Sequence, residues 1–170
     1  RVFTLAPGDS DSRISLEFDG IFRDALIALN GHLVGRNFSG YAPYRADVSD
    51  IVSRTGRNVL VVRVDATEHE GWFYEGAGIY RHVWLVKSAP LHVAHWGTCI
   101  RTAVTAAHAL VTITTELENQ GEATACRVAQ SLEDADGRVV ATSISGPTRL
   151  AAWSGTEVTQ RLELTNPRLW

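Results

Sequence analysis

Residues 109–119, ALVTITTELEN, alternate apolar and polar side chains along almost their whole length. Val111, Ile113 and Leu117 fall on one side of an extended chain, and threonine and glutamate residues fall on the other. This period of two is typical of a β-strand with one buried face. Further strand patterns occur at residues 14–20, 58–66, 80–88 and 156–166. Strands that recur about every 8–12 residues, with turn residues between them, predict an all-β sandwich architecture.

Turn signals indicate where neighbouring strands fold back on each other. Asn30-Gly31 interrupts the apolar segment 25–35. A type I′ hairpin turn needs positive φ at both central residues, and Asn-Gly is the dipeptide that supplies it most readily. A second hairpin is predicted at residues 135–137, between strands at 123–134 and 138–146.

One segment of the first half has a helical pattern. Residues 47–56, DVSDIVSRTG, predict one or two helical turns, with Asp47 or Ser49 capping the start and Gly56 closing the end. The strand that follows, residues 58–66, is apolar on both faces for most of its length. This pattern favours a central position in a sheet.

Composition and charge exclude several classes of protein. The chain has 170 residues, 45% of them hydrophobic, which is enough for a packed core. Its formal net charge is -3 and its basic residues are scattered, so no nucleic-acid partner is expected. No apolar run approaches the roughly 20 residues that span a bilayer, so no membrane partner is expected either.

The chain contains no methionine, so we expect it to be a processed product or, more plausibly, an excerpt of a longer protein. The pattern of residues along the chain changes at Pro90, which predicts a domain boundary near residue 89. The predicted domains are therefore residues 1–89, a sandwich with one helical insert, and residues 90–170, an immunoglobulin-like sandwich. Cys99 and Cys126 are expected to be free, buried thiols.

Residues 65–82 concentrate carboxylates and aromatic rings. Aromatic rings stack on the C–H faces of sugars, but large rings on loops also suit a domain interface, and the residues alone leave both readings open. Glu68, His69, Glu70 and Glu75 lack metal-ligand spacing, so they are expected to form a solvated acidic loop, with no metal ion and no cofactor. No nucleophile motif is present, which predicts no catalytic residue in this chain.

Several blocks together resemble glycoside hydrolase family 2. They are LEFDGIFRDALIALNGHLVG, GYAPY, ADVSDIV, RNVLVVRVDA and GAGIYRHVWL. They are similar to the N-terminal sugar-binding-type domain of β-galactosidases, a galactose-binding-like jelly roll, which lacks its first strands here. The second half resembles the immunoglobulin-like domain that follows, and its last strands are expected to be cut off.

The resemblance implies how the chain functions. Catalysis would belong to a downstream (β/α)8 barrel of the same polypeptide, which is absent here, and a carbohydrate would be the substrate. Asp65 matches a family aspartate that reaches the barrel's mouth and contacts the sugar. Trp72 and Tyr74 match the aromatic loop beside that site, where packing against the barrel or sugar contact is expected. Tyr80 and Arg81 are expected to be structural.

Alternatives remain at this point. The parent enzyme could be a β-glucuronidase or a β-mannosidase, the chain could be a free-standing carbohydrate-binding module, or it could mediate homo-oligomer contacts. The sequence is compatible with a periplasmic, a secreted or a cytoplasmic protein.

Overall fold

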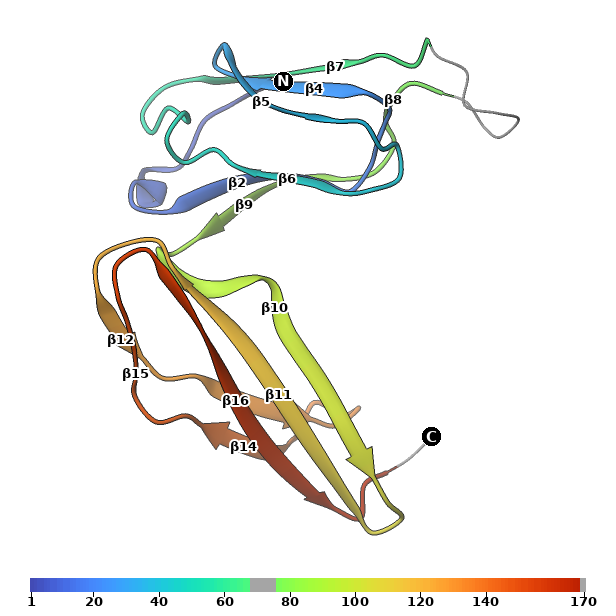
Figure 1. Ribbon diagram of the computed structural model, residues 1–170, viewed down its shortest axis with the longest axis vertical. Helices are drawn as coiled ribbons and strands as arrows, with labels where there is room; N and C mark the ends of the chain where they lie inside the picture. The colour runs from blue at the N-terminus through green and yellow to red at the C-terminus, as the bar shows by residue number, and fades with distance from the viewer. Residues whose placement is uncertain (68–75, 169–170) are drawn as a thin grey trace. The chain divides into compact units, whose positions relative to one another are not determined.

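A computed structural model describes residues 1–67 and 76–168, in which the regular structure is β except for one short 3-10 helix, η1 (Pro7–Asp9). The all-β prediction is confirmed. The chain divides into two compact units, Arg1–Ala89 and Pro90–Trp170 (Figure 1), here called unit 1 and unit 2.

Unit 1 contains two antiparallel sheets and a two-stranded ribbon. Its strands are β1 (Val2–Phe3), β2 (Arg13–Phe18), β3 (Ile21–Phe22), β4 (Ala25–Leu29), β5 (His32–Asn37), β6 (Tyr44–Asp47), β7 (Asn58–Val64), β8 (Gly78–Ile79) and β9 (Val83–Ser88). One sheet has the order β1-β7-β4-β5 and the other has the order β6-β2-β9, while β3 pairs with β8. The two sheets face each other across the core (Figure 1).

The core of unit 1 follows from the alternation in its strands. Ile14, Leu16 and Phe18 of β2 point into the core, as do Ile27 and Leu29 of β4. Full burial of side chains of this size stabilises the fold by about 1.5–3 kcal/mol each. The core of unit 1 is therefore built mainly by alternate side chains of β2 and β4.

Two predicted strands differ in detail from the observed ones. β7 lies between β1 and β4, which confirms its interior position, but Val59 and Val61 on its outer face are exposed. The strand predicted to begin at residue 80 begins at Val83, because the chain bends at Arg81 before pairing with β2.

The predicted hairpin turn at Asn30-Gly31 is confirmed. The φ angles are 52° at Asn30 and 85° at Gly31, as a type I′ turn requires. The Asn30 side chain is also held in place. Its Nδ2 donates to the carbonyl of Ile51 and to Oδ1 of Asn58, both at 2.9 Å, and its Oδ1 accepts from the amide of Val59.

Of the one or two helical turns predicted at residues 47–56, the structure has one. The amide of Val52 bonds the carbonyl of Val48 at 3.0 Å, and Oδ1 of Asp47 accepts from the amide of Ser49 at 2.8 Å. The turn does not propagate because the fully buried Asn58 side chain binds both the amide and the carbonyl of Ser53. A distant polar side chain thus takes the backbone groups that a second helical turn would need.

Asp47 makes unit 1 sensitive to acid. Burial by itself raises the pKa of Asp47, but hydrogen bonds from Ser49 and from Arg13 outweigh burial, so the pKa lies below its ordinary value. A carboxyl with a lowered folded pKa stabilises the fold above its unfolded pKa of about 3.9, and this stabilisation is lost as the pH falls through the folded value. We expect Asp47→Asn to cost about 1 kcal/mol at pH 7 and almost nothing at pH 2.

Urea titrations of both proteins at the two pH values measure this difference. An equal loss at both pH values would mean that Asp47 acts through its shape and not through its charge.

Unit 2 contains one long sheet and two shorter ribbons. Its strands are β10 (Leu91–Val104), β11 (His108–Asn119), β12 (Thr124–Cys126), β13 (Ala129–Glu133), β14 (Val139–Ile144), β15 (Thr148–Leu150) and β16 (Ser154–Thr165). The long sheet has the order β10-β11-β16, and β12 pairs with β15 and β13 with β14. The single strand predicted at 123–134 is divided into β12 and β13, which pair with different partners.

The inner face of the long sheet is covered unevenly. Val111 and Ile113 of β11 and Leu162 of β16 form a small core against Leu132 and Ala141. Ile100 of β10 lies opposite Ile113 in the ladder, yet its side chain is 59% exposed. The predicted alternation of residues 109–119 is confirmed, and β10 is the part of the sheet that the described residues leave uncovered.

Both cysteines are free, as predicted, but neither is buried: Cys126 is half-buried and Cys99 is exposed. Cys99 lies on β10 at the edge of the sheet, opposite Thr114 on the outer face.

Candidate functional site

Asp65 directly follows β7 and is the one predicted site residue within the described part of the chain. Its amide donates to the carbonyl of Arg23 at 3.2 Å, which ties the end of β7 to the bend that precedes β4. The sheet therefore determines the position of Asp65, and its side chain stays partly accessible.

The Asp65 carboxylate is held by its neighbours in the sequence. Oδ1 accepts from the hydroxyl of Thr67 at 2.7 Å and from the amide of Thr67 at 3.2 Å, and Oδ2 faces Nη2 of Arg63 at 3.3 Å. The Thr67 bonds are the main reason that the pKa of Asp65 is lowered, and Arg63 adds to the effect. Asp65 is thus an ionised carboxylate at neutral pH, with acceptor capacity left on Oδ2.

A second acidic residue, Asp24, lies at the same end of unit 1. Arg36 of β5 binds it through two nitrogens, with Nη2 2.6 Å from Oδ2. These hydrogen bonds lower the pKa of Asp24, and the charges of Asp24 and Asp65 act on each other. The guanidinium of Arg36 also lies 4.3 Å from the centre of the Phe38 ring. We call Asp24, Arg36, Arg63 and Asp65 the β7-end cluster.

An aromatic hollow lies next to the bend that holds Asp65. It has a volume of about 390 Å³, and Phe22, Tyr41, Gly78 and Tyr80 line it. The rings of Phe22 and Tyr41 meet edge to face, 5.6 Å between centres. Phe22 directly precedes Arg23, whose carbonyl accepts the Asp65 amide, so one short segment supports both the hollow and the carboxylate.

The residues of GIYRHVW have mainly structural contacts. The hydroxyl of Tyr80 donates to the carbonyl of Gly40 at 2.8 Å, which agrees with the structural role expected for it. Arg81 is exposed, and no ion-pair partner for it lies within residues 1–67 and 76–168. Asp19 receives a bond of 3.1 Å from Nε1 of Trp84 and lies 3.7 Å from Nδ1 of His82.

Trp72 and Tyr74 lie outside the described residues, as do Glu68, His69, Glu70 and Glu75 of the acidic loop. Among the residues that are described, no three His, Cys, Asp or Glu side chains gather as they would around a metal ion. No helix in that part of the chain is long and apolar enough to cross a membrane.

Sequence reasoning missed Asp24 and Arg36. A regular two-residue hairpin at Asn30-Gly31 would pair Leu26 with Gly35, but a bulge between Ile27 and Ala28 shifts the ladder and pairs Leu26 with Arg36. The bulge brings the arginine within reach of Asp24. In the sequence, the only indication of this pair is that Asp24 and Arg36 carry opposite charges at the two ends of the hairpin predicted at Asn30-Gly31.

The arrangement is suited to binding a neutral polar molecule. A fixed, ionised carboxylate accepts hydrogen bonds from hydroxyl groups, and exposed aromatic rings beside it offer apolar faces. The same combination suits a polar interface between domains.

Comparison with known proteins identifies consistent relatives. The family model described as glycosyl hydrolase 2 galactose-binding domain-like matches residues 1–103. A β-galactosidase of Bacteroides ovatus is 36% identical over 176 residues, covering 100% of this chain and 20% of that protein. A β-glucuronidase of Formosa agariphila is 26% identical over 191 residues, covering 99% of this chain and 19% of that protein.

Solved structures agree with these sequence relatives. The crystal structure of a glycosyl hydrolase family 2 member from Bacteroides cellulosilyticus matches with a TM-score of 0.93 and 31% sequence identity. The match covers 100% of this chain and 24% of that one. The chain thus spans about a fifth of the length of the curated relatives described above.

Proposed function

The chain belongs to the glycosyl hydrolase 2 galactose-binding domain-like family, which confirms the predicted resemblance, and from this premise we propose that it is the non-catalytic N-terminal part of a β-galactosidase. Its parent, the longer polypeptide that would contain it, hydrolyses terminal β-D-galactosides with retention. Residues 1–89 are the sugar-binding-type jelly roll and residues 90–170 the immunoglobulin-like sandwich. The 36% identity with the Bacteroides ovatus β-galactosidase over the whole chain is the observation that carries the proposal.

The chemistry of the reaction indicates which part of the parent carries the catalytic groups. Retaining hydrolysis needs a nucleophile and an acid/base carboxyl about 5–5.5 Å apart across the scissile bond. We place both on a downstream (β/α)8 barrel, because the chain spans only about a fifth of its relatives. The chain supports the barrel and contributes Asp65 to the rim of its active site.

Asp65 recognises the terminal sugar in this proposal. Its Oδ1 is occupied by Thr67, and the 3.3 Å contact from Arg63 leaves Oδ2 able to accept a bond from a sugar hydroxyl. The lowered pKa keeps the group an acceptor throughout the neutral range. Trp72 and Tyr74 contribute to the same wall by packing on the barrel or on the sugar ring.

A β-glucuronidase parent is the second candidate, and the Formosa agariphila relative favours it. The substrates of the two enzymes would differ in two places: a galactoside has a hydroxymethyl group on C5 and an axial 4-hydroxyl, and a glucuronide has a carboxylate on C5 and an equatorial 4-hydroxyl. A site built for the neutral sugar would leave the carboxylate of a glucuronide buried without a cation, which costs several kcal/mol.

Assays of the full-length parent on aryl β-galactoside and aryl β-glucuronide distinguish these functions. We expect kcat/KM to favour the galactoside by at least about 100-fold, since an unpaired buried charge costs about 3–5 kcal/mol. NMR of the first-formed sugar should show the β anomer. A preference for the glucuronide would establish the second candidate. Galactose binding measured by calorimetry, without hydrolysis of either substrate, would identify a free-standing binding module instead.

A further inference from the structure

The loop between β5 and β6, residues 38–43, is fixed by its own hydrogen bonds. Oδ1 of Asn37 accepts from the amide of Ser39 at 3.3 Å, and Oγ of Ser39 accepts from the amides of Tyr41 at 3.3 Å and Ala42 at 3.1 Å. Nδ2 of Asn37 closes the loop by donating to the carbonyl of Ala42 at 3.3 Å. The backbone of Tyr41 is therefore held in one place, although the residue is 68% exposed.

The same loop packs closely on the rest of unit 1. The hydroxyl of Tyr80 donates to the carbonyl of Gly40 at 2.8 Å. A Cβ atom at Gly40 would lie 2.2 Å from a ring carbon of Phe22, so only glycine lets the loop come this close. The edge-to-face contact between Phe22 and Tyr41 then orients the third ring. Three rings from three separate segments are thus fixed around the aromatic hollow before any ligand binds, which lowers the entropic cost of binding.

The aromatic hollow has the size and the chemistry of a site for a small neutral molecule. Its volume of about 390 Å³ falls within the range of about 300–1,000 Å³ that is usual for ligand sites. Among the described residues that line it, none carries a charge. Gly76 and Gly78 also line it, and a Cβ atom at either would meet none of the other described residues within 4 Å. The walls therefore offer stacking faces to a neutral sugar ring and no partner to a carboxylate or a phosphate.

We propose that the aromatic hollow binds the second sugar of the substrate, the neutral pyranose to which the terminal galactose is linked. The inference rests on the proposed function, because it takes Asp65 as the group that holds the terminal sugar. Phe22 of the hollow directly precedes Arg23, whose carbonyl accepts the amide of Asp65 at 3.2 Å. One peptide link and one hydrogen bond thus separate the backbones of the two sites, which places both within the length of a disaccharide. The parent then acts on galactose at the end of a sugar chain and not on simple alkyl galactosides.

Tyr41→Ala in the full-length parent tests this assignment with two substrates that share a terminal galactose. One is a disaccharide of galactose β-linked to glucose, and the other is methyl β-galactoside, which has no second sugar. We expect kcat/KM on the disaccharide to fall by about 10-fold, which corresponds to about 1.4 kcal/mol of lost stacking. The kcat/KM on the methyl galactoside and the inhibition by free galactose should stay within about twofold, since both depend on the terminal-sugar site alone.

Two further variants separate stacking on the ring from other effects. Tyr41→Phe keeps the ring and should keep kcat/KM on the disaccharide within about threefold. Phe38→Ala is the matched control, since Phe38 lies on the same loop and is 67% exposed, but packs on Arg36 and does not line the hollow. It should leave the ratio of the two kcat/KM values within about twofold. The melting temperature of each variant checks that the loop is still folded.

Three results would overturn the inference: an equal loss on both substrates, no loss on the disaccharide, or the same change of ratio in Phe38→Ala. An equal loss would mean that Tyr41 supports the terminal-sugar site or a domain contact. The choice of the wild-type parent between galactosides and glucuronides decides the proposed function separately. If the parent prefers glucuronides, the corresponding pair of glucuronides tests the hollow in the same way.

Discussion

Replacement of Asp65 by asparagine in the full-length parent is expected to lower kcat/KM on an aryl β-galactoside by about 10- to 100-fold. This factor corresponds to the loss of one hydrogen bond between a charged group and the sugar, worth about 1.5–3 kcal/mol. Asparagine keeps an oxygen that can accept from the amide and hydroxyl of Thr67, so the local fold should persist. The melting temperature should change little, which separates recognition from stability.

Asp50→Asn is the matched control for this experiment. The Asp50 side chain is 92% exposed and lies 3.8 Å from Arg13, in a loop that follows β6 and not β7. Its substitution should leave kcat/KM within about twofold, as expected for an exposed ion pair of small energetic effect. If Asp65→Asn has no greater effect than Asp50→Asn, Asp65 does not contact the substrate.

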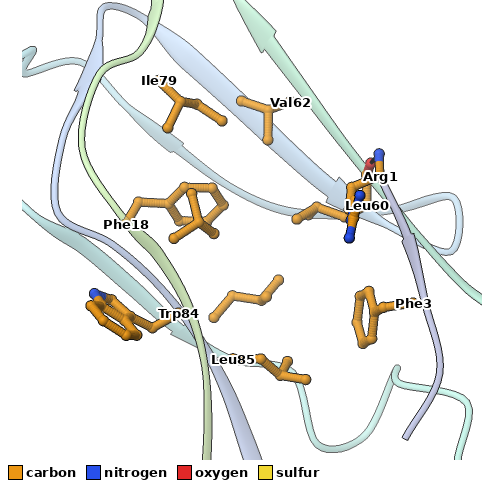
Figure 2. A pocket seen from close by; sticks show the side chains of 10 residues that line it. Arg1, Phe3, Phe18, Leu60, Val62, Ile79, Trp84 and Leu85 are labelled. Carbon is orange, nitrogen blue, oxygen red and sulfur yellow. Dashed lines mark hydrogen bonds between the residues drawn. The ribbon is translucent and has the colours of Figure 1, made fainter.

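Phe18→Ala is expected to cause the largest loss of stability, about 3 kcal/mol. The ring is fully buried and lies 6.4 Å from that of Tyr44 between the two sheets. Truncation of a buried phenylalanine costs about 3–5 kcal/mol through lost burial and the cavity left behind. The lower end applies because Phe18 already lines an open cavity of about 570 Å³ in unit 1 (Figure 2).

Phe38→Ala controls for the loss of an aromatic ring as such. Phe38 is 67% exposed, and its recorded ring contact is with the guanidinium of Arg36. An exposed contact of this type is worth about 0.5–1 kcal/mol. Urea unfolding of both variants measures the difference. Equal losses would mean that this cavity leaves Phe18 as poorly packed as a surface residue.

Local sequence signals predicted most of the strands, because the relevant interactions lie within one strand or one turn. Alternation alone identified residues 109–119, where the odd-numbered side chains are buried. The Asn30-Gly31 turn was predicted from the φ angles that it requires, and it has them. The family blocks added the identity of the fold, which alternation cannot supply because many sandwiches share it.

Where the predicted structure differs from the observed one, the cause lies in residues outside the segment in question. The single turn within residues 47–56 is not followed by a second one because Asn58, a buried side chain, binds the backbone of Ser53. Cys99 is exposed because β10 lies at a sheet edge, a fact of topology that no window of sequence contains. The single strand predicted at 123–134 is divided in two because its first part, β12, pairs with β15 and its second part, β13, pairs with β14.

The candidate site was predictable only in part. Asp65 was identified through the family block and not through its own environment. Asp24 and Arg36 join it because a one-residue bulge shifts the β4–β5 register, and alternation does not reveal which strand carries a bulge. Trp72 and Tyr74 remain predictions, since they lie outside the described residues.

The Asn30-Gly31 turn has a consequence for the chemical ageing of the protein. Asparagine before glycine is prone to deamidation, in which the glycine nitrogen attacks the asparagine carboxamide, and asparagine is among the thermolabile residues. Here the carboxamide of Asn30 is fixed by Ile51, Asn58 and Val59, which prevents it from turning toward the nitrogen of Gly31. Deamidation should therefore proceed only from molecules in which unit 1 has opened. The fraction of isoaspartate at position 30 in a stored sample would then record the average time that its molecules have spent with unit 1 open.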